Sequence, residues 1–86
     1  EVEVDTLEQL DEVMAHSIDV VLLDNMTLDQ LREGVELIEG RAIVEASGGI
    51  TAENVRAVAE TGVDVISMGW LTHSAPNLDV ALDVEL

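Results

Sequence analysis

The sequence predicts an α/β fold in which parallel strands alternate with helices, as part of a larger α/β barrel. Three times the chain repeats an extended apolar run, a short polar loop and a threonine that opens a helical pattern. The runs are too continuously apolar for strands with one face in water, which favours a parallel sheet. Barrels of this type need roughly 250 residues. We therefore expect residues 1–86 to form a single unit, the carboxyl-terminal part of a barrel domain.

The first two helices begin with the same signal. Thr6 is followed by Gln9, and Thr27 by Gln30, which is the spacing of a capping box. The strands before them are predicted within "EVEVDT" and at residues 20–23. Apolar residues then recur at helical spacing, namely Leu7, Leu10, Val13 and Met14 in the first helix and Leu31, Val35 and Ile38 in the second.

The third unit has a strand predicted at residues 42–46 and the segment "SGGIT", with Thr51 as the cap of a third helix. Gly40 and Gly62 fit the position after a helix end. A fourth strand is predicted at residues 63–68. Residues 71–77 are too few for a crossover helix, so we expect a short connection there and a last strand at residues 78–86.

The charge balance excludes several classes of partner. The chain has 19 acidic residues against three arginines and no lysine, for a net charge of −16. Nucleic acids and anionic membranes require a basic face, so neither is an expected partner. Self-repulsion at this charge is relieved by salt, and we interpret the acid excess as the surface of a halophilic, cytoplasmic protein; an acidic mesophilic protein is the alternative. The chain has no cysteine and no apolar run of ~20 residues.

Carboxylates follow three successive predicted strands. Glu3, Asp24 and Glu45 are predicted at equivalent points of these strands, at the edge where parallel α/β folds carry their sites. If Val2 and Val4 face the helices, Glu3 faces the opposite side. Such oxygen ligands suit Mg²⁺ together with substrate phosphates. The alternative is three surface acids in a very acidic protein.

The glycines after the third and fourth strands predict a phosphate site. Ser47, Gly48 and Gly49 precede the expected helix start at Thr51, and Gly69 ends the next strand. Backbone N–H groups near a helix start bind phosphate, and glycines permit close approach. A plain turn is the alternative. His73 beyond these residues could contact an anion or act as an acid or base, or make one ordinary loop hydrogen bond.

The segments "EVEVDTLEQL", "VLLDNM", "EASGGIT", "TGVDVISMG" and "LTHSAPNLDVALD" resemble, in order and spacing, the carboxyl-terminal part of quinolinate phosphoribosyltransferase. The resemblance covers essentially the whole chain. It implies an incomplete, seven-stranded α/β barrel beside an amino-terminal domain, working as a dimer or larger assembly. The implied reaction, in NAD biosynthesis, converts quinolinate and phosphoribosyl pyrophosphate to nicotinate mononucleotide, pyrophosphate and carbon dioxide, with Mg²⁺.

The resemblance also implies roles for single residues. Glu3 and Asp24 would lie near the ribose and the magnesium pyrophosphate, and Glu45 would line the barrel mouth. The 5′-phosphate would be held by the glycine turn, with His73 beside it; the implied phosphate-binding residues are Ser47, Gly48, Gly49 and Gly69.

The sequence departs from the family pattern in two respects. Trp70 stands where the family usually has a small residue, and the family's basic residues that grip quinolinate lie upstream of this chain. The chain begins inside a predicted strand and without Met, which is typical of a piece of a longer protein, and we expect it to be inactive by itself.

Two other functions stay open on sequence grounds. One is a non-catalytic βα fragment that self-associates through its uncovered sheet face. The other is a different phosphate-binding barrel enzyme, such as thiamin phosphate synthase or indole-glycerol phosphate synthase. Those enzymes share the glycine pair but not "LDN" with "LTHSAP".

Overall fold

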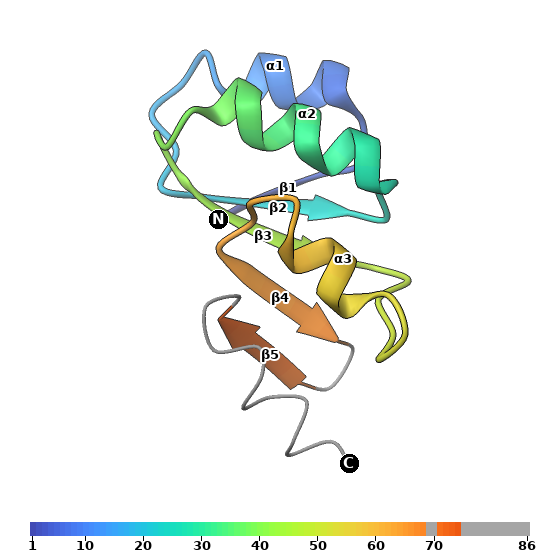
Figure 1. Ribbon diagram of the computed structural model, residues 1–86. Helices are drawn as coiled ribbons and strands as arrows, with labels where there is room; N and C mark the ends of the chain where they lie inside the picture. The colour runs from blue at the N-terminus through green and yellow to red at the C-terminus, as the bar shows by residue number, and fades with distance from the viewer. Residues whose placement is uncertain (69–70, 75–86) are drawn as a thin grey trace.

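The computed structural model describes residues 1–68 and 71–74, the latter as backbone only. Strands and helices alternate along the chain up to the last strand (Figure 1). Their order and bounds are β1 (Val2–Val4), α1 (Leu7–Val13), β2 (Val20–Asp24), α2 (Leu28–Ile38), β3 (Ile43–Ser47), α3 (Val55–Ala59), β4 (Val65–Met68) and β5 (Leu71–Ser74).

The strands form one sheet in the order β1-β2-β3-β4-β5, and the pairs among the first four are parallel. Figure 1 shows α1 and α2 lying side by side over the β1–β2 part of the sheet, with α3 beside β4. Neighbouring strands that follow sequence order, joined through helices, make the wall of a barrel rather than a doubly wound sheet. The predicted fold class is confirmed.

The core lies between the helices and one face of the sheet. Alternate strand residues point into it, which is the period-two pattern of a pleated strand. On the opposite face Glu3 and Ile43 are exposed, Ile43 by 50 %, and Leu22 and Glu45 are half-buried. The buried hydrophobic residues are Val4, Val21, Leu23, Val44, Ala46 and Ile66 from the strands, Leu10, Leu31, Ile38, Val55 and Val58 from the helices, and Met14 and Val63 from the connecting segments.

Of the two predicted capping boxes, the one at Thr27 forms completely and the one at Thr6 forms only in part. In α2 the Thr27 hydroxyl accepts from the Gln30 N–H at 3.2 Å, and Gln30 Oε1 accepts from the Thr27 N–H at 2.9 Å, a complete capping box. In α1 the Thr6 hydroxyl accepts from the Gln9 N–H, but the Gln9 side chain reaches back to the N–H of Asp5 instead.

The third helix starts later than predicted. The Thr51 hydroxyl accepts from the Asn54 N–H at 3.4 Å, and Asn54 Oδ1 accepts from the Thr51 N–H at 2.8 Å. This reciprocal pair closes a single turn, and α3 begins only at Val55. Asparagine bonds readily to nearby backbone, which explains why the turn forms before the helix.

The last described strand also differs from the prediction. Residues 71–77 were expected to be a connection, yet β5 (Leu71–Ser74) pairs antiparallel with β4, with Leu71 opposite Met68. A sheet edge presents unpaired N–H and C=O groups, and β5 satisfies those of β4. The strand predicted at residues 78–86 lies outside the described residues. Within the described part, no helix is long and apolar enough to cross a membrane.

Candidate phosphate and carboxylate site

The carboxyl ends of β2, β3 and β4 meet at one edge of the sheet, because these strands are parallel and adjacent. An open hollow of about 400 Å³ lies there. Its polar lining comes from Asp24 at the end of β2, Ser47 at the end of β3, Ser67 in β4 and the loop of residues 48–51. The hollow is within the size range of small-molecule sites.

Asp24 and Ser47 form the polar centre of this hollow. They are register partners on neighbouring strands, and both are half-buried. The Ser47 hydroxyl donates a hydrogen bond of 3.0 Å to Asp24 Oδ1. A hydrogen bond to a carboxylate is stronger than one between neutral groups, so this bond orients the Asp24 carboxylate. Among the residues that the structure describes, its other oxygen accepts no hydrogen bond.

The adjacent glycines answer a structural need. Gly48 has φ +83° and Gly49 φ +68°, a left-handed conformation that residues with a Cβ rarely adopt. A Cβ on Gly48 would lie 2.8 Å from Asp24 Oδ1 and 2.8 Å from the backbone N of Asn25. The turn therefore packs directly against the end of β2, and only glycine fits there.

The glycine turn also leaves donors unused. Within residues 1–68 and 71–74, the N–H groups of Gly48 and Gly49 donate to no acceptor, whereas the Gly49 carbonyl accepts from Asn54 Nδ2 at 3.0 Å. Successive backbone N–H groups in such a turn form an anion-binding concavity. The helix that follows contributes little, because α3 has only five residues and begins six positions after Gly49.

The three carboxylates predicted at equivalent points of successive strands do not all share one row: Glu3 and Glu45 do, and Asp24 does not. Glu3 is opposite Leu22, and Leu22 is opposite Glu45, so the glutamates share a row with an apolar residue between them. Asp24 lies one pleat further toward the carboxyl edge. Strand geometry puts Glu3 and Asp24 roughly 8 Å apart at Cα, and Glu3 and Glu45 roughly 10 Å. The reason is that β2 runs two residues past the row of Glu3, and Asp24 is its last residue.

The carboxylates at this edge are suited to bind Mg²⁺ only when a bound substrate supplies further ligands. The described residues contain no group of three or more acidic, histidine or cysteine side chains that could hold a metal. Mg²⁺ is commonly bound by one or two carboxylates with substrate phosphates and water completing its shell. Asp24 and Glu3, which lie on adjacent strands, fit this arrangement of two carboxylates with substrate phosphates.

The remaining predicted site residues are only partly placed. Gly69 and Trp70 lie outside the described residues. The backbone of His73 belongs to β5 and is opposite Ile66, two residues before the end of β4.

Asn25 is a residue that sequence reasoning missed. It directly follows β2, has φ +56°, and donates its N–H to the Ser47 carbonyl at 2.8 Å. The sequence feature that could have indicated this turn is an asparagine directly after a strand, because asparagine tolerates the left-handed region better than most residues with a side chain.

A second hollow lies at the opposite edge of the sheet. It measures about 510 Å³ and is lined by residues 14–19, which connect α1 to β2, and by Arg41 before β3. Arg41 already donates to the carbonyl oxygens of Ile38 and Leu37 at the end of α2. Neither the strand-end carboxylates nor the glycine turn reach this hollow, so the site chemistry belongs to the other edge.

The sequence matches a known family over nearly its whole length. The model of the family described as quinolinate phosphoribosyl transferase, C-terminal domain, matches residues 1–83. The chain belongs to this family.

The names of individual curated relatives are consistent with this family. The chain is 46 % identical over 86 residues to a probable nicotinate-nucleotide pyrophosphorylase (carboxylating) of Bacillus subtilis, covering 100 % of this chain and 30 % of the relative. It is 38 % identical over 91 residues to the corresponding probable enzyme of Methanocaldococcus jannaschii, covering 98 % and 32 %. The chain thus spans about a third of the length of these curated relatives.

A solved structure shows the same fold. The nicotinate-nucleotide pyrophosphorylase of Ehrlichia chaffeensis superposes with a TM-score of 0.76 at 35 % identity, over 84 % of this chain and 27 % of that one. The enzyme from Francisella tularensis gives 0.73 at 37 % identity, over 78 % and 24 %. The α/β arrangement of the described residues is therefore that of this family's barrel domain.

Proposed function

We propose that this chain is the carboxyl-terminal barrel segment of a quinolinate phosphoribosyltransferase, and that its sheet edge holds the phosphoribosyl group. One observation carries the proposal. In a chain of this family, the glycine turn presents two N–H groups that donate to no acceptor among the described residues, beside the hydrogen-bonded pair of Asp24 and Ser47. Donors for a phosphate and a carboxylate for a sugar thus occupy one hollow.

The 5′-phosphate is the group that the glycine turn would bind. The N–H groups of Gly48 and Gly49 would supply the donors, while the Ser47 hydroxyl donates its one hydrogen to Asp24 and holds that carboxylate beside them. Gly69 is a further proposed contact, with His73 beside it. Binding a phosphate remote from the reacting carbon orients that carbon and makes the transfer effectively unimolecular. The turn's backbone donors are fixed in place by the tight packing of Gly48.

The carboxylates would act on the ribose. The bond from ribose C1 to pyrophosphate breaks and the bond from C1 to the quinolinate nitrogen forms. The carboxylate beside that nitrogen then leaves as carbon dioxide, and the ring carbon takes up a proton from water in its place. Positive charge develops on the ribose as pyrophosphate departs, and Asp24 and Glu3 would stabilise it electrostatically. Glu45 lines the mouth of the barrel. Mg²⁺, when bound with the pyrophosphate, would offset the leaving group's negative charge.

Quinolinate itself would be gripped by residues outside this chain. Its two carboxylates call for cations, but Arg32 pairs with Asp29 at 3.1 Å and Arg41 is bonded to helix carbonyls. We therefore propose that activity requires the remainder of the protein, working as a cytoplasmic homo-oligomer.

A segment exchange tests the proposal. The 86 residues replace the matching segment of the Bacillus subtilis relative, which is 46 % identical over that length. We expect the folded chimera to form nicotinate mononucleotide from quinolinate and phosphoribosyl pyrophosphate, and the chimera with Asp24→Asn to lose this activity. A chimera that melts cooperatively but forms no product, beside an active relative, would refute the proposal. If the chimera does not fold, the same assay is made on the full-length protein that contains the chain.

A further inference from the structure

Asn25 has a left-handed backbone conformation at the end of β2. Its φ is +56°, and among residues with a side chain in the described part only Glu39 shares a positive φ. Its N–H donates to the Ser47 carbonyl at 2.8 Å, which extends the β2–β3 ladder one residue past the end of β2. The chain therefore turns left-handed while it is still bonded to the neighbouring strand.

The glycine turn is built against the backbone of Asn25. A Cβ on Gly48 would lie 2.8 Å from the Asn25 N and 3.0 Å from its Cα, and the same point is 2.8 Å from Asp24 Oδ1. Gly48, Asn25 and Asp24 are thus in mutual contact. A change of backbone conformation at Asn25 must move Gly48, Asp24 or both, because no space separates them.

We propose that Asn25 is a positioning residue whose left-handed backbone sets the distance between the Asp24 carboxylate and the phosphate-binding N–H groups of the glycine turn. The inference rests on the proposed function, since that function assigns ribose to one group and phosphate to the other. The ribose and the 5′-phosphate of one substrate molecule must be bound at the same time. The separation between Asp24 and the glycine turn therefore determines how tightly phosphoribosyl pyrophosphate binds.

Asparagine suits the position for a physical reason. A left-handed residue has its Cβ close to the following carbonyl oxygen, and only glycine, asparagine and aspartate adopt this region routinely. Valine resists it strongly, because its branched Cβ prefers the extended region. The substitution Asn25→Val therefore changes the backbone, whereas Asn25→Gly removes the side chain and keeps the backbone.

Glu39 offers a matched control. It has φ +52°, nearly the same as Asn25, but it caps the end of α2, near the opposite edge of the sheet. Glu39→Val imposes the same kind of backbone strain away from the site. If lowered stability alone raised the KM for phosphoribosyl pyrophosphate, the rise would be equal in Asn25→Val and Glu39→Val.

The test is steady-state kinetics of the active full-length protein or chimera with phosphoribosyl pyrophosphate varied at saturating quinolinate. For Asn25→Val we expect KM to rise about tenfold, the consequence of a left-handed β-branched residue, with a smaller change in kcat. Asn25→Gly should keep KM within about twofold of the unsubstituted protein. Glu39→Val should lower Tm while leaving KM unchanged.

The outcomes that overturn the inference are separate from those that overturn the function. An unsubstituted protein that transfers no phosphoribosyl group overturns the proposed function, and the inference falls with it. If transfer occurs but Asn25→Val leaves KM unchanged, or Glu39→Val raises it as much, only the inference falls. The inference also fails if Asn25→Gly raises KM as far as Asn25→Val, since the side chain would then be the acting group. Asn25→Ala replaces the valine variant if that variant does not fold.

Discussion

The Ser47 hydroxyl donates a 3.0 Å hydrogen bond to Asp24 Oδ1, across the carboxyl ends of two neighbouring parallel strands. The bond joins the residue before the glycine turn to the carboxylate that the turn packs against. Phosphate donors and a carboxylate are thereby held as one rigid unit rather than as two independent loops.

Removing the charge of Asp24 should therefore affect catalysis more than stability. We expect Asp24→Asn to lower kcat/KM about 10²–10³-fold, as for other groups that stabilise transition-state charge. The amide oxygen can still accept from Ser47, so the free energy of unfolding should change by less than about 1 kcal/mol.

The control for this variant is Asp19→Asn, because Asp19 is exposed and precedes β2 at the opposite edge of the sheet. It removes the same charge outside the site. Equal kcat/KM in the two variants, measured in the active chimera or full-length protein, would contradict the role of Asp24.

The tight packing of Gly48 predicts a large loss on substitution. Gly48→Ala forces a Cβ to 2.8 Å from backbone and carboxylate atoms at φ +83°, whereas Gly40→Ala at φ +73° has nothing within 4 Å. Gly40→Ala should cost about 1–2 kcal/mol of unfolding free energy from the conformation alone, and Gly48→Ala about 1–3 kcal/mol more from overpacking. Urea unfolding of both variants measures the difference in unfolding free energy. Equal losses of unfolding free energy would mean that the structure around residue 48 shifts at no cost to admit the added Cβ.

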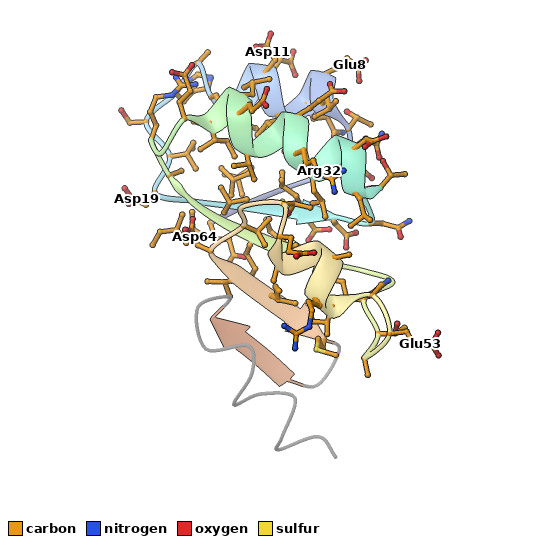
Figure 2. All side chains as sticks on the ribbon, viewed as in Figure 1. Glu8, Asp11, Asp19, Arg32, Glu53 and Asp64 are labelled. Carbon is orange, nitrogen blue, oxygen red and sulfur yellow. The ribbon has the colours of Figure 1, made fainter. Side chains whose placement is uncertain are left out.

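The acidic surface predicts a strong dependence on salt. Figure 2 shows Glu8 and Asp11 projecting outward from α1 and Glu53 projecting from the loop before α3. Arg32 pairs with Asp29, whose side chain is 90 % exposed, and the chain has only two further arginines against its 19 acidic residues. Most of the negative charge thus has no arginine to offset it.

Raising potassium chloride from 0.1 M to 1 M shortens the Debye length from about 10 Å to about 3 Å and should raise Tm. Each 1 kcal/mol of relief corresponds to about 4–8 °C for a domain of this size. The double variant Glu8→Gln, Asp11→Asn should show a smaller dependence. A Tm that does not respond to salt would argue against a surface shaped by self-repulsion.

The chain by itself is predicted to have no phosphoribosyltransferase activity. Arg32 pairs with Asp29 within α2, Arg41 donates to the carbonyl oxygens of Ile38 and Leu37 at the end of that helix, and Arg56 also has a partner. The two carboxylates of quinolinate need cations. An absorbance assay of the isolated chain in molar potassium chloride, with the chimera as the active control, should detect no nicotinate mononucleotide. Turnover by the isolated chain would show that quinolinate is held without residues from elsewhere.

Local patterns in the sequence determined most of the architecture. The capping box of Thr27 and Gln30, the helical spacing of Leu31 and Ile38, and the continuous apolar strands each depend on residues near one another in the chain. Helix starts and amphipathic faces follow from such short-range chemistry. The sequence alone therefore predicts the parallel α/β class, the family resemblance and the glycine turn.

Only the tertiary structure decided how these parts meet. The strand register placed Asp24 one pleat beyond the row of Glu3 and Glu45, and the contact of Gly48 with Asn25 gave the first glycine its structural reason. The same is true of β5, which formed where a connection was expected because β4 presented an unpaired edge. Register, close approach between loops and edge pairing join residues that are distant in sequence, and packing rather than local propensity sets them.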